Sequence, residues 1–179
     1  MYELLVLSAL LTGSESVYKL RKIMEDTFSV RRSLSNGVLY PLLKELESKE
    51  YVIITKTENR GRRENKVSLT KKGQERIHDL LNQPIKADIN REEMLHLKLT
   101  LIGIELPEKQ YKFYSDYVTY FEEMAESKRN LKNHLTKKYD GVIGTERIID
   151  STLSSIDLDI ELAETKIRFA NQKIKELRK

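Results

Sequence analysis

The chain has 179 residues, of which 39% are apolar, 34% are charged and none is cysteine. This length suits one larger domain or two small ones, and we expect two small units. The lack of cysteine excludes disulfides, thiolate metal sites and cysteine nucleophiles, and it indicates the cytoplasm. Residues 1–76 carry 15 Lys and Arg against 10 Asp and Glu, so the basic excess lies in the first half.

The first apolar segment, LLVLSALL at residues 4–11, predicts a core helix that ends at the following Thr-Gly pair. This segment is too short to cross a membrane and lacks the features of a signal peptide. Ser14 or Ser16 then caps a second helix, whose apolar residues recur at helical spacing: Val17, Leu20, Ile23 and Met24. Tyr18 and Lys19 fall on other faces of this second helix.

A third helix is expected after Ser35, although it contains Gly37 and Pro41, which both destabilise helix interiors. Its apolar residues share one side: Val38, Leu39, Leu42, Leu43 and Leu46. The other side holds the glycine and the proline together with Asn36, Tyr40, Lys44 and Ser48. Such a bare, polar face suits close approach to DNA phosphates and base edges, while the alternative is a structural turn before a helix that begins later.

Two segments rich in β-branched residues, YVIITKTE and NKVSLT, flank the basic turn NRGRRE and predict a β-hairpin. Thr70 then caps a closing helix, so the N-terminal half reads as a winged helix-turn-helix with a two-stranded wing. Four basic residues surround Gly61 in the wing: Arg60, Arg62, Arg63 and Lys66. Basic side chains there bind phosphate or a narrow minor groove, and the alternative is a solvated polar turn.

The segment SNGVLYPLLKELESKEYV, followed by KVSLTKKG, resembles the PadR family of transcriptional regulators. The residues that carry the resemblance are Ser35, Gly37, Tyr40, Pro41, Leu43, Leu46 and Glu47, then Leu69, Thr70 and Gly73. The second half resembles the longer helical C-terminal domain of one branch of the family. The resemblance implies DNA binding and regulation by a small molecule, such as a phenolic acid or a drug, and we expect an effector-responsive repressor.

The chain departs from the family pattern at three places. Only the tyrosine of a His-Gly-Tyr motif is kept at the start of the second helix, as Tyr18. Glu50 stands where the family commonly has glycine, and Val67 stands where the wing commonly has an aromatic residue. The departures concern contacts made by the second helix and the wing, whereas the expected fold is unaffected.

Pro84 interrupts the helical pattern, and we expect a DNA-binding domain at residues 1–83, a linker at 84–90 and a helical dimerisation and effector domain at 91–179. Within the last range, Pro107 opens a long helix. The predicted fold class is therefore mainly α, with a winged helix-turn-helix followed by long C-terminal helices.

A heptad seam follows the Asp140-Gly141 break, with apolar residues at alternating steps of four and three. Its members are Ile149, Leu153, Ile156, Ile160, Ala163, Ile167, Ala170, Ile174 and Leu177. The preceding helix of the same chain is one possible partner, in an antiparallel hairpin. We favour a homodimer that pairs these helices across subunits, because reading a palindromic operator requires two-fold symmetry.

Six aromatic residues lie between positions 111 and 121, and four of them are candidates for a pocket that binds a small aromatic effector: Tyr111, Tyr114, Tyr117 and Phe121. The same spacing is typical of an ordinary helical core. His78, His96 and His134 have no metal-ligand spacing, so we expect no enzyme, metal or cofactor. The remaining alternative, a winged-helix scaffold for protein partners, would lack the basic surface.

Overall fold

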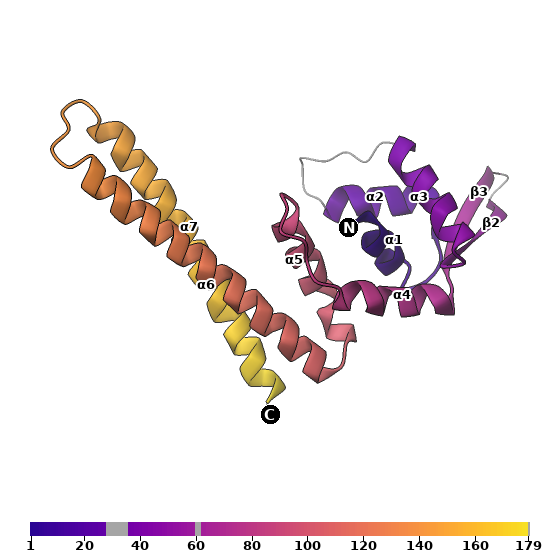
Figure 1. Ribbon diagram of the computed structural model, residues 1–179. Helices are drawn as coiled ribbons and strands as arrows, with labels where there is room; N and C mark the ends of the chain where they lie inside the picture. Colours follow the sequence, from indigo (N-terminus) through magenta and orange to yellow (C-terminus); the bar gives the residue numbers. More distant parts are fainter. Residues whose placement is uncertain (28–35, 60–61, 179) are drawn as a thin grey trace. The chain divides into compact units, whose positions relative to one another are not determined.

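The computed structural model describes residues 1–27, 36–59 and 62–178 and divides into two compact units, Met1–Ile104 and Glu105–Lys179. The elements of the first unit are α1 (Tyr2–Ala9), β1 (Glu15–Ser16), α2 (Val17–Thr27), α3 (Asn36–Ser48), β2 (Val52–Asn59), β3 (Arg62–Leu69), α4 (Lys71–Asn82), α5 (Arg91–Leu101) and the 3₁₀-helix η2 (Ile102–Ile104) (Figure 1). The second unit holds α6 (Pro107–Lys138) and α7 (Glu146–Leu177). The predicted fold class, mainly α with a winged helix-turn-helix, is confirmed.

The core of the first unit forms where the helices bury their apolar sides against the small sheet. Its fully buried members come from every helix of the motif and from both wing strands: Leu4, Leu7, Leu20, Met24, Leu39, Leu43, Leu46, Val52, Val67 and Ile77. Helix α2 begins as expected, because Ser16 Oγ accepts a hydrogen bond from the Lys19 amide at 3.2 Å. Ser16 is thus the cap among the two predicted candidates.

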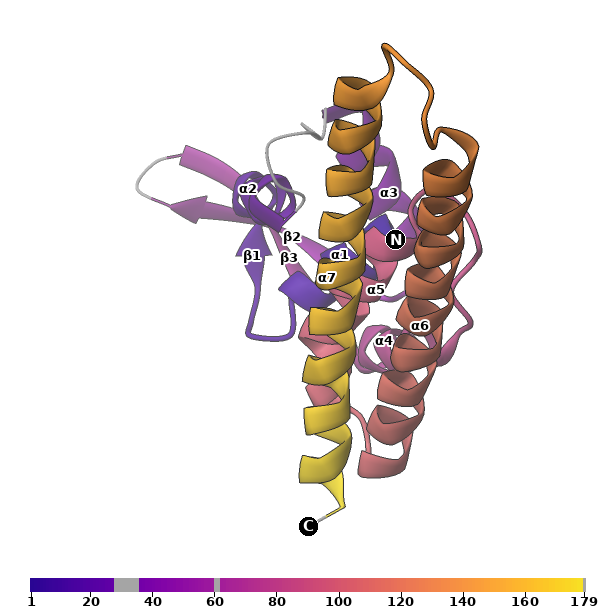
Figure 2. The same ribbon diagram turned by 90° about the vertical axis from the view of Figure 1, so that its left-hand side faces the viewer.

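The sheet has three antiparallel strands in the order β1-β3-β2. The predicted hairpin is confirmed, with Ile54 opposite Val67 and Asn59 opposite Arg62. Strand β1 pairs with the other side of β3, with Glu15 opposite Val67 and Ser16 opposite Lys66 (Figure 2). A strand of two residues has no alternating pattern, so periodicity alone does not reveal it.

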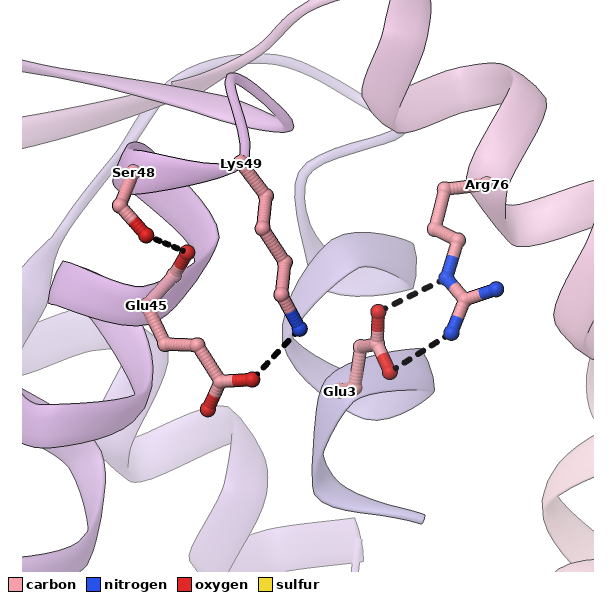
Figure 3. A network of polar contacts seen from close by, with 5 residues as sticks. All are labelled: Glu3, Glu45, Ser48, Lys49 and Arg76. Atoms are coloured by element: carbon pink, nitrogen blue, oxygen red, sulfur yellow. Dashed lines mark hydrogen bonds and ion pairs between the residues drawn. The ribbon is translucent and has the colours of Figure 1, made fainter.

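Helix α4 is tied to α1 by a two-point ion pair. Arg76 donates through Nε and Nη2 to the two carboxylate oxygens of Glu3, at 2.9 and 3.2 Å (Figure 3). This contact raises the pKa of Arg76, because the facing carboxylate favours the charged guanidinium. At the end of α3, Glu45 pairs with Lys49 at 2.6 Å and Ser48 Oγ donates to the Glu45 carbonyl.

Helix α5 packs into the first unit, whereas the expected domain boundary was a linker at 84–90, with this helix in the second domain. Lys98, which is only 3% exposed, explains the difference. Its ammonium donates to the carbonyls of Leu81, at 2.9 Å, and Gln83, so α5 closes the C-terminal end of α4. A single lysine within an apolar run carries no signal of that contact.

The second unit is an antiparallel helical hairpin in which α7 lies along α6 (Figures 1 and 2). The middle of the heptad seam is buried, at Ile156, Ala163 and Ala170. Ion pairs join the two helices over one short stretch of each, residues 128–132 of α6 and 157–164 of α7: Lys128 to Asp159 at 2.6 Å, Arg129 to Glu164 at 2.7 Å and Lys132 to Asp157 at 2.5 Å. The seam is therefore covered within the chain, as in the hairpin alternative.

Candidate nucleic-acid interface

The polar side of α3 is exposed in the way that the spacing predicted. Gly37, Tyr40, Pro41 and Lys44 are all exposed, while the opposite side of the helix is buried in the core. Pro41 lies inside the helix and has no amide hydrogen to donate to the Gly37 carbonyl, so this side carries a bare stretch of backbone. A helix with such a face, held by a rigid core, can approach a groove closely and present the Tyr40 hydroxyl and the Lys44 ammonium.

One prediction for α3 is wrong. Val38 was expected on the core side, but its side chain is 41% exposed. At about 100° per residue, Val38 lies about 100° from Leu39, which is fully buried, and thus at the edge of the apolar side. Ser35 lies outside the described residues, and for Asn36 only the backbone, at the first position of α3, is described.

Three of the predicted basic residues of the wing lie on β3: Arg62, Arg63 and Lys66. Arg62 and Arg63 pair through their backbones with Asn59 and Glu58, and Arg60 lies outside the described residues. Lys66 is exposed and sits opposite both Thr55 and Ser16 in the sheet register. The base of the wing is thereby joined to the start of α2.

At that start, Tyr18 is 79% exposed and Lys19 is exposed beside it. Lys19 Nζ pairs with the Glu15 carboxylate at 2.7 Å. An exposed pair of this kind is weak, so it leaves the lysine available to a phosphate. Among the predicted site residues, those at the base of the wing and those at the start of α2 are thus brought together through β1. The polar face of α3 lies on the same compact unit.

The structure adds contacts to two residues of the family motif, Thr70, which was predicted to cap α4, and Gly73. Thr70 Oγ1 accepts from the Gly73 amide at 2.9 Å and lies 2.7 Å from the Glu50 carbonyl, to which it donates. A Cβ at Gly73 would stand 2.1 Å from the Tyr51 carbonyl oxygen, so only glycine fits there. The spacing Thr-x-x-Gly is the signal for this close contact.

The candidate effector residues form packed aromatic contacts. Tyr114, Tyr117 and Phe121 are buried, and the Tyr117 and Phe121 ring centroids lie 4.7 Å apart. Tyr111 is exposed, and its hydroxyl accepts a hydrogen bond from Arg178 Nη2 at 2.9 Å, which lowers the pKa of Tyr111. Three of the four rings therefore contribute to the core of the hairpin.

The described residues hold neither a candidate metal site nor a candidate membrane-spanning helix. Within residues 1–27, 36–59 and 62–178, no three His, Cys, Asp or Glu side chains gather in a way that could hold a metal ion. No helix in the same part of the chain is long and apolar enough to span a membrane.

The fold and this surface define a winged helix-turn-helix protein of the DNA-binding class. Residues 6–79 match the sequence model of the transcriptional regulator PadR-like family. A PadR-like domain thus occupies residues 6–79, and this match together with the fold indicates a DNA-binding transcriptional regulator.

Solved structures with similar chains include Bacillus subtilis PadR in complex with operator DNA, at 17% identity, with 98% of each chain covered and a TM-score of 0.44. The same Bacillus subtilis protein in complex with p-coumaric acid shows 16% identity over 99% of this chain and 98% of that one, with a TM-score of 0.40. The PadR-like regulator BC1756 from Bacillus cereus shows 20% identity over 99% and 98%, with a TM-score of 0.40. No curated protein matches the sequence.

Proposed function

We propose that the chain is an effector-responsive repressor that binds a palindromic operator as a homodimer. The observation that carries the DNA-binding part is the exposed face of α3, where Tyr40, Pro41 and Lys44 stand opposite a side on which Leu39, Leu43 and Leu46 are buried. This face enters the major groove, and the wing arginines hold the flanking backbone. Ser35, Asn36 and Gly37 belong to the same proposed contact, together with Tyr18, Lys19 and Lys66.

Binding is tested by a mobility shift with the promoter region next to the protein's own coding sequence, at several salt concentrations. Arg62→Ala or Arg63→Ala weakens binding to all sequences alike and lowers the salt slope by about one per lost phosphate contact. Tyr40→Phe or Lys44→Ala lowers the preference for that region over random DNA by roughly 1–3 kcal/mol where a base contact is lost. Equal losses on both kinds of DNA for all four variants contradict specific readout by α3.

A second apolar strip on α7 supports the homodimer. Ile148, Leu158, Leu162 and Phe169 lie within about 80° of one another around the helix and are between 42% and 70% exposed. They are distinct from the heptad seam, whose central residues are buried in the hairpin. We therefore place the contact between copies on this strip, while the seam residues Ile149, Leu153, Ile156, Ile160, Ile167 and Ile174 support it from the same helix.

The charges of α7 favour an antiparallel pairing of two copies. Residues 146–164 contain six acidic residues, of which Asp157, Asp159 and Glu164 pair with α6, and one basic residue, whereas residues 165–178 contain five basic residues and one acidic residue. A two-fold axis that crosses α7 near Leu162 places the acidic part of one copy against the basic part of the other. Such a contact is self-complementary, as the interface of a symmetric dimer must be.

The effector is proposed to be a small aromatic compound that binds the second unit. Its support is the cluster of aromatic side chains with neighbouring cations, such as Lys166 over the Phe121 ring at 4.3 Å and Arg178 over the Tyr111 ring at 5.3 Å. A ligand changes operator affinity only if it binds two states of the dimer differently. p-Coumaric acid, present in one of the similar structures, is the first compound to add to the DNA complex.

A calorimetric titration of the free protein with the same compound accompanies that experiment. Release of the operator together with binding to the free protein is the expected result. If a screen of aromatic compounds yields none that binds the protein, and operator occupancy follows protein concentration alone, then the effector-responsive part of the proposal is wrong.

A further inference from the structure

Three elements meet at the side chain of Thr70. The hydroxyl donates to the carbonyl of Glu50, the residue that ends the turn after α3, at 2.7 Å. It accepts from the amide of Gly73, in the first turn of α4, at 2.9 Å, and the Thr70 amide donates to the Tyr51 carbonyl at 3.1 Å. One residue at the end of the wing therefore contacts both the end of α3 and the start of α4.

The turn that follows α3 is itself tightly specified. The Tyr51 amide donates to the Leu46 carbonyl at 2.9 Å and the Glu50 amide donates to the Glu47 carbonyl at 2.9 Å, which is the pattern of a Schellman motif. This motif requires a left-handed residue, and Glu50 accordingly has a φ of +62°. The chain thus leaves α3 and enters β2 in a single, defined direction.

Glu47 supplies a second connection from α3 to the wing. Its Oε1 accepts a hydrogen bond from the amide of Ile54 at 3.2 Å. Strand β2 is at the edge of the sheet, since its only neighbour in the described strands is β3, so this amide points away from the ladder. The last turn of α3 and the wing are therefore held at two points, Glu47 with Ile54 and Thr70 with Glu50.

The length of the wing makes the angle between the wing and α3 important. Each wing strand has eight residues, which corresponds to about 26 Å at 3.3 Å per residue. A tilt of about 10° at the base therefore moves the tip by roughly 4–5 Å, more than the length of a hydrogen bond. A DNA contact by the tip and one by α3 can be made together only if the angle between the two elements is held.

We propose that Glu47 and Thr70 are positioning residues for DNA recognition. Neither residue needs to touch the nucleic acid. The two residues hold the wing at a fixed angle to α3, so the wing and α3 engage one half-site without the entropy cost of ordering them on binding. This inference rests on the proposed DNA-binding function. It gives a physical role to Glu47, a motif residue outside the proposed DNA contacts, and it adds a second role to Thr70, the N-cap of α4.

Matched substitutions separate the hydrogen bonds from size and charge. Thr70→Val removes the hydroxyl and keeps the shape, whereas Thr70→Ser keeps the hydroxyl. Glu47→Met and Glu47→Gln both remove the charge, but only the glutamine retains an acceptor for the Ile54 amide. Each variant is prepared in the full chain and compared well below its unfolding temperature.

The first measurement needs no DNA. The chain has no cysteine, so Glu45→Cys on α3 and Lys56→Cys on β2, both exposed positions, provide two unique sites for spin labels. The distribution of distances between the labels broadens in Thr70→Val and Glu47→Met and stays narrow in Thr70→Ser and Glu47→Gln. Equal widths in all four variants overturn the inference, whatever the result with DNA.

The second measurement uses a duplex selected by the parent protein from a random library and an unselected duplex of the same length. Thr70→Val and Glu47→Met lose on the order of tenfold in preference for the selected duplex, and their conservative partners do not. Arg62→Ala also has a smaller effect in the Glu47→Met background, because the wing is no longer held in place. An unchanged preference, with a full effect of Arg62→Ala, shows that the two residues contribute only to stability.

The two proposals fail in different ways. A parent protein that selects no duplex contradicts the proposed function, and the label distances then still decide whether the joint is rigid. A parent that selects a duplex, with variants that select it equally well, contradicts only the positioning role.

Discussion

The carboxylate of Glu50 lies 2.8 Å from Nζ of Lys72, and the same glutamate has a φ of +62°. The ion pair joins the turn after α3 to the first turn of α4, and it lowers the pKa of Glu50 and raises that of Lys72. The backbone, by contrast, is in a region that side chains with a Cβ disfavour. One residue therefore combines a favourable contact on the surface with an unfavourable conformation.

We expect Glu50→Gly to raise the unfolding midpoint by about 2–5 °C, because glycine adopts positive φ without a steric penalty. Glu50→Gln is the control, since it removes the charge and keeps the strained backbone. It should lower the midpoint slightly at low salt and have no effect at high salt. Thermal unfolding followed by circular dichroism measures both, and a lower midpoint for the glycine variant contradicts the account.

Gly73→Ala should destabilise the first unit by about 3 kcal/mol or more, because its methyl group would meet the Tyr51 carbonyl oxygen at 2.1 Å. Gly103→Ala is the matched control, as no atom lies within 4 Å of a Cβ at that position. Urea unfolding of both variants gives the two free energies. Similar values would mean that α4 can move away from Tyr51 at little cost.

Lys98→Met should change how stability depends on pH. Burial lowers the pKa of Lys98 from 10.5 to about 8. Between these values the unfolded chain binds a proton that the folded chain does not, so this lysine makes the folded state more stable as pH rises, and below pH 8 the effect is constant. The advantage of the parent over the variant should therefore grow by roughly 1.4 kcal/mol per pH unit in this window.

Urea unfolding at pH 7, 8.5 and 10 provides the comparison for Lys98. At the lowest of these pH values the variant still lacks a donor to the carbonyls of Leu81 and Gln83. Parallel pH profiles for the two proteins would show that Lys98 titrates normally in the folded chain.

The helical hairpin should respond differently to changes on the two faces of α7. Leu162→Glu places a charge on the exposed strip, and we expect it to convert the dimer to a monomer while helix content is kept. Ile156→Ala shortens a buried seam residue and should cost about 2–4 kcal/mol in stability. Sedimentation and thermal unfolding distinguish the two effects.

Ending the chain near Asp140 removes both faces of α7 and should also leave a monomer. A parent chain that is monomeric at micromolar concentration contradicts the proposed dimer.

Gly37→Leu should weaken operator binding more than its helix propensity would indicate. Leucine is a better helix former than glycine, and position 37 is exposed, so the variant should be at least as stable as the parent. Its side chain would nevertheless hold the α3 backbone away from the groove. Thermal stability and operator affinity are measured on the same sample. Full affinity in a stable variant would show that Gly37 serves the backbone conformation at the start of α3 and not contact with the groove.

The sequence by itself determined the elements that depend on residues close together in the chain. The β-branched residues of YVIITKTE and the alternation in NKVSLT, on either side of a basic segment with a glycine, were sufficient to predict the hairpin. The spacing of Leu39, Leu43 and Leu46 was sufficient to separate the buried and exposed sides of α3. Thr70 can be recognised as a helix cap from the sequence, because its hydrogen bond to the Gly73 amide joins residues only three positions apart. The PadR motif lies within this same local range.

Only the tertiary structure decided what each surface faces. The heptad seam requires a partner helix, but nothing in the repeat distinguishes α6 of the same chain from α7 of another copy. The exposure of Val38, the short strand β1 and the contact of Lys98 with the end of α4 likewise depend on residues distant in sequence. Burial and hydrogen bonding across such separations are set when the whole unit packs, and a local pattern holds no information about them.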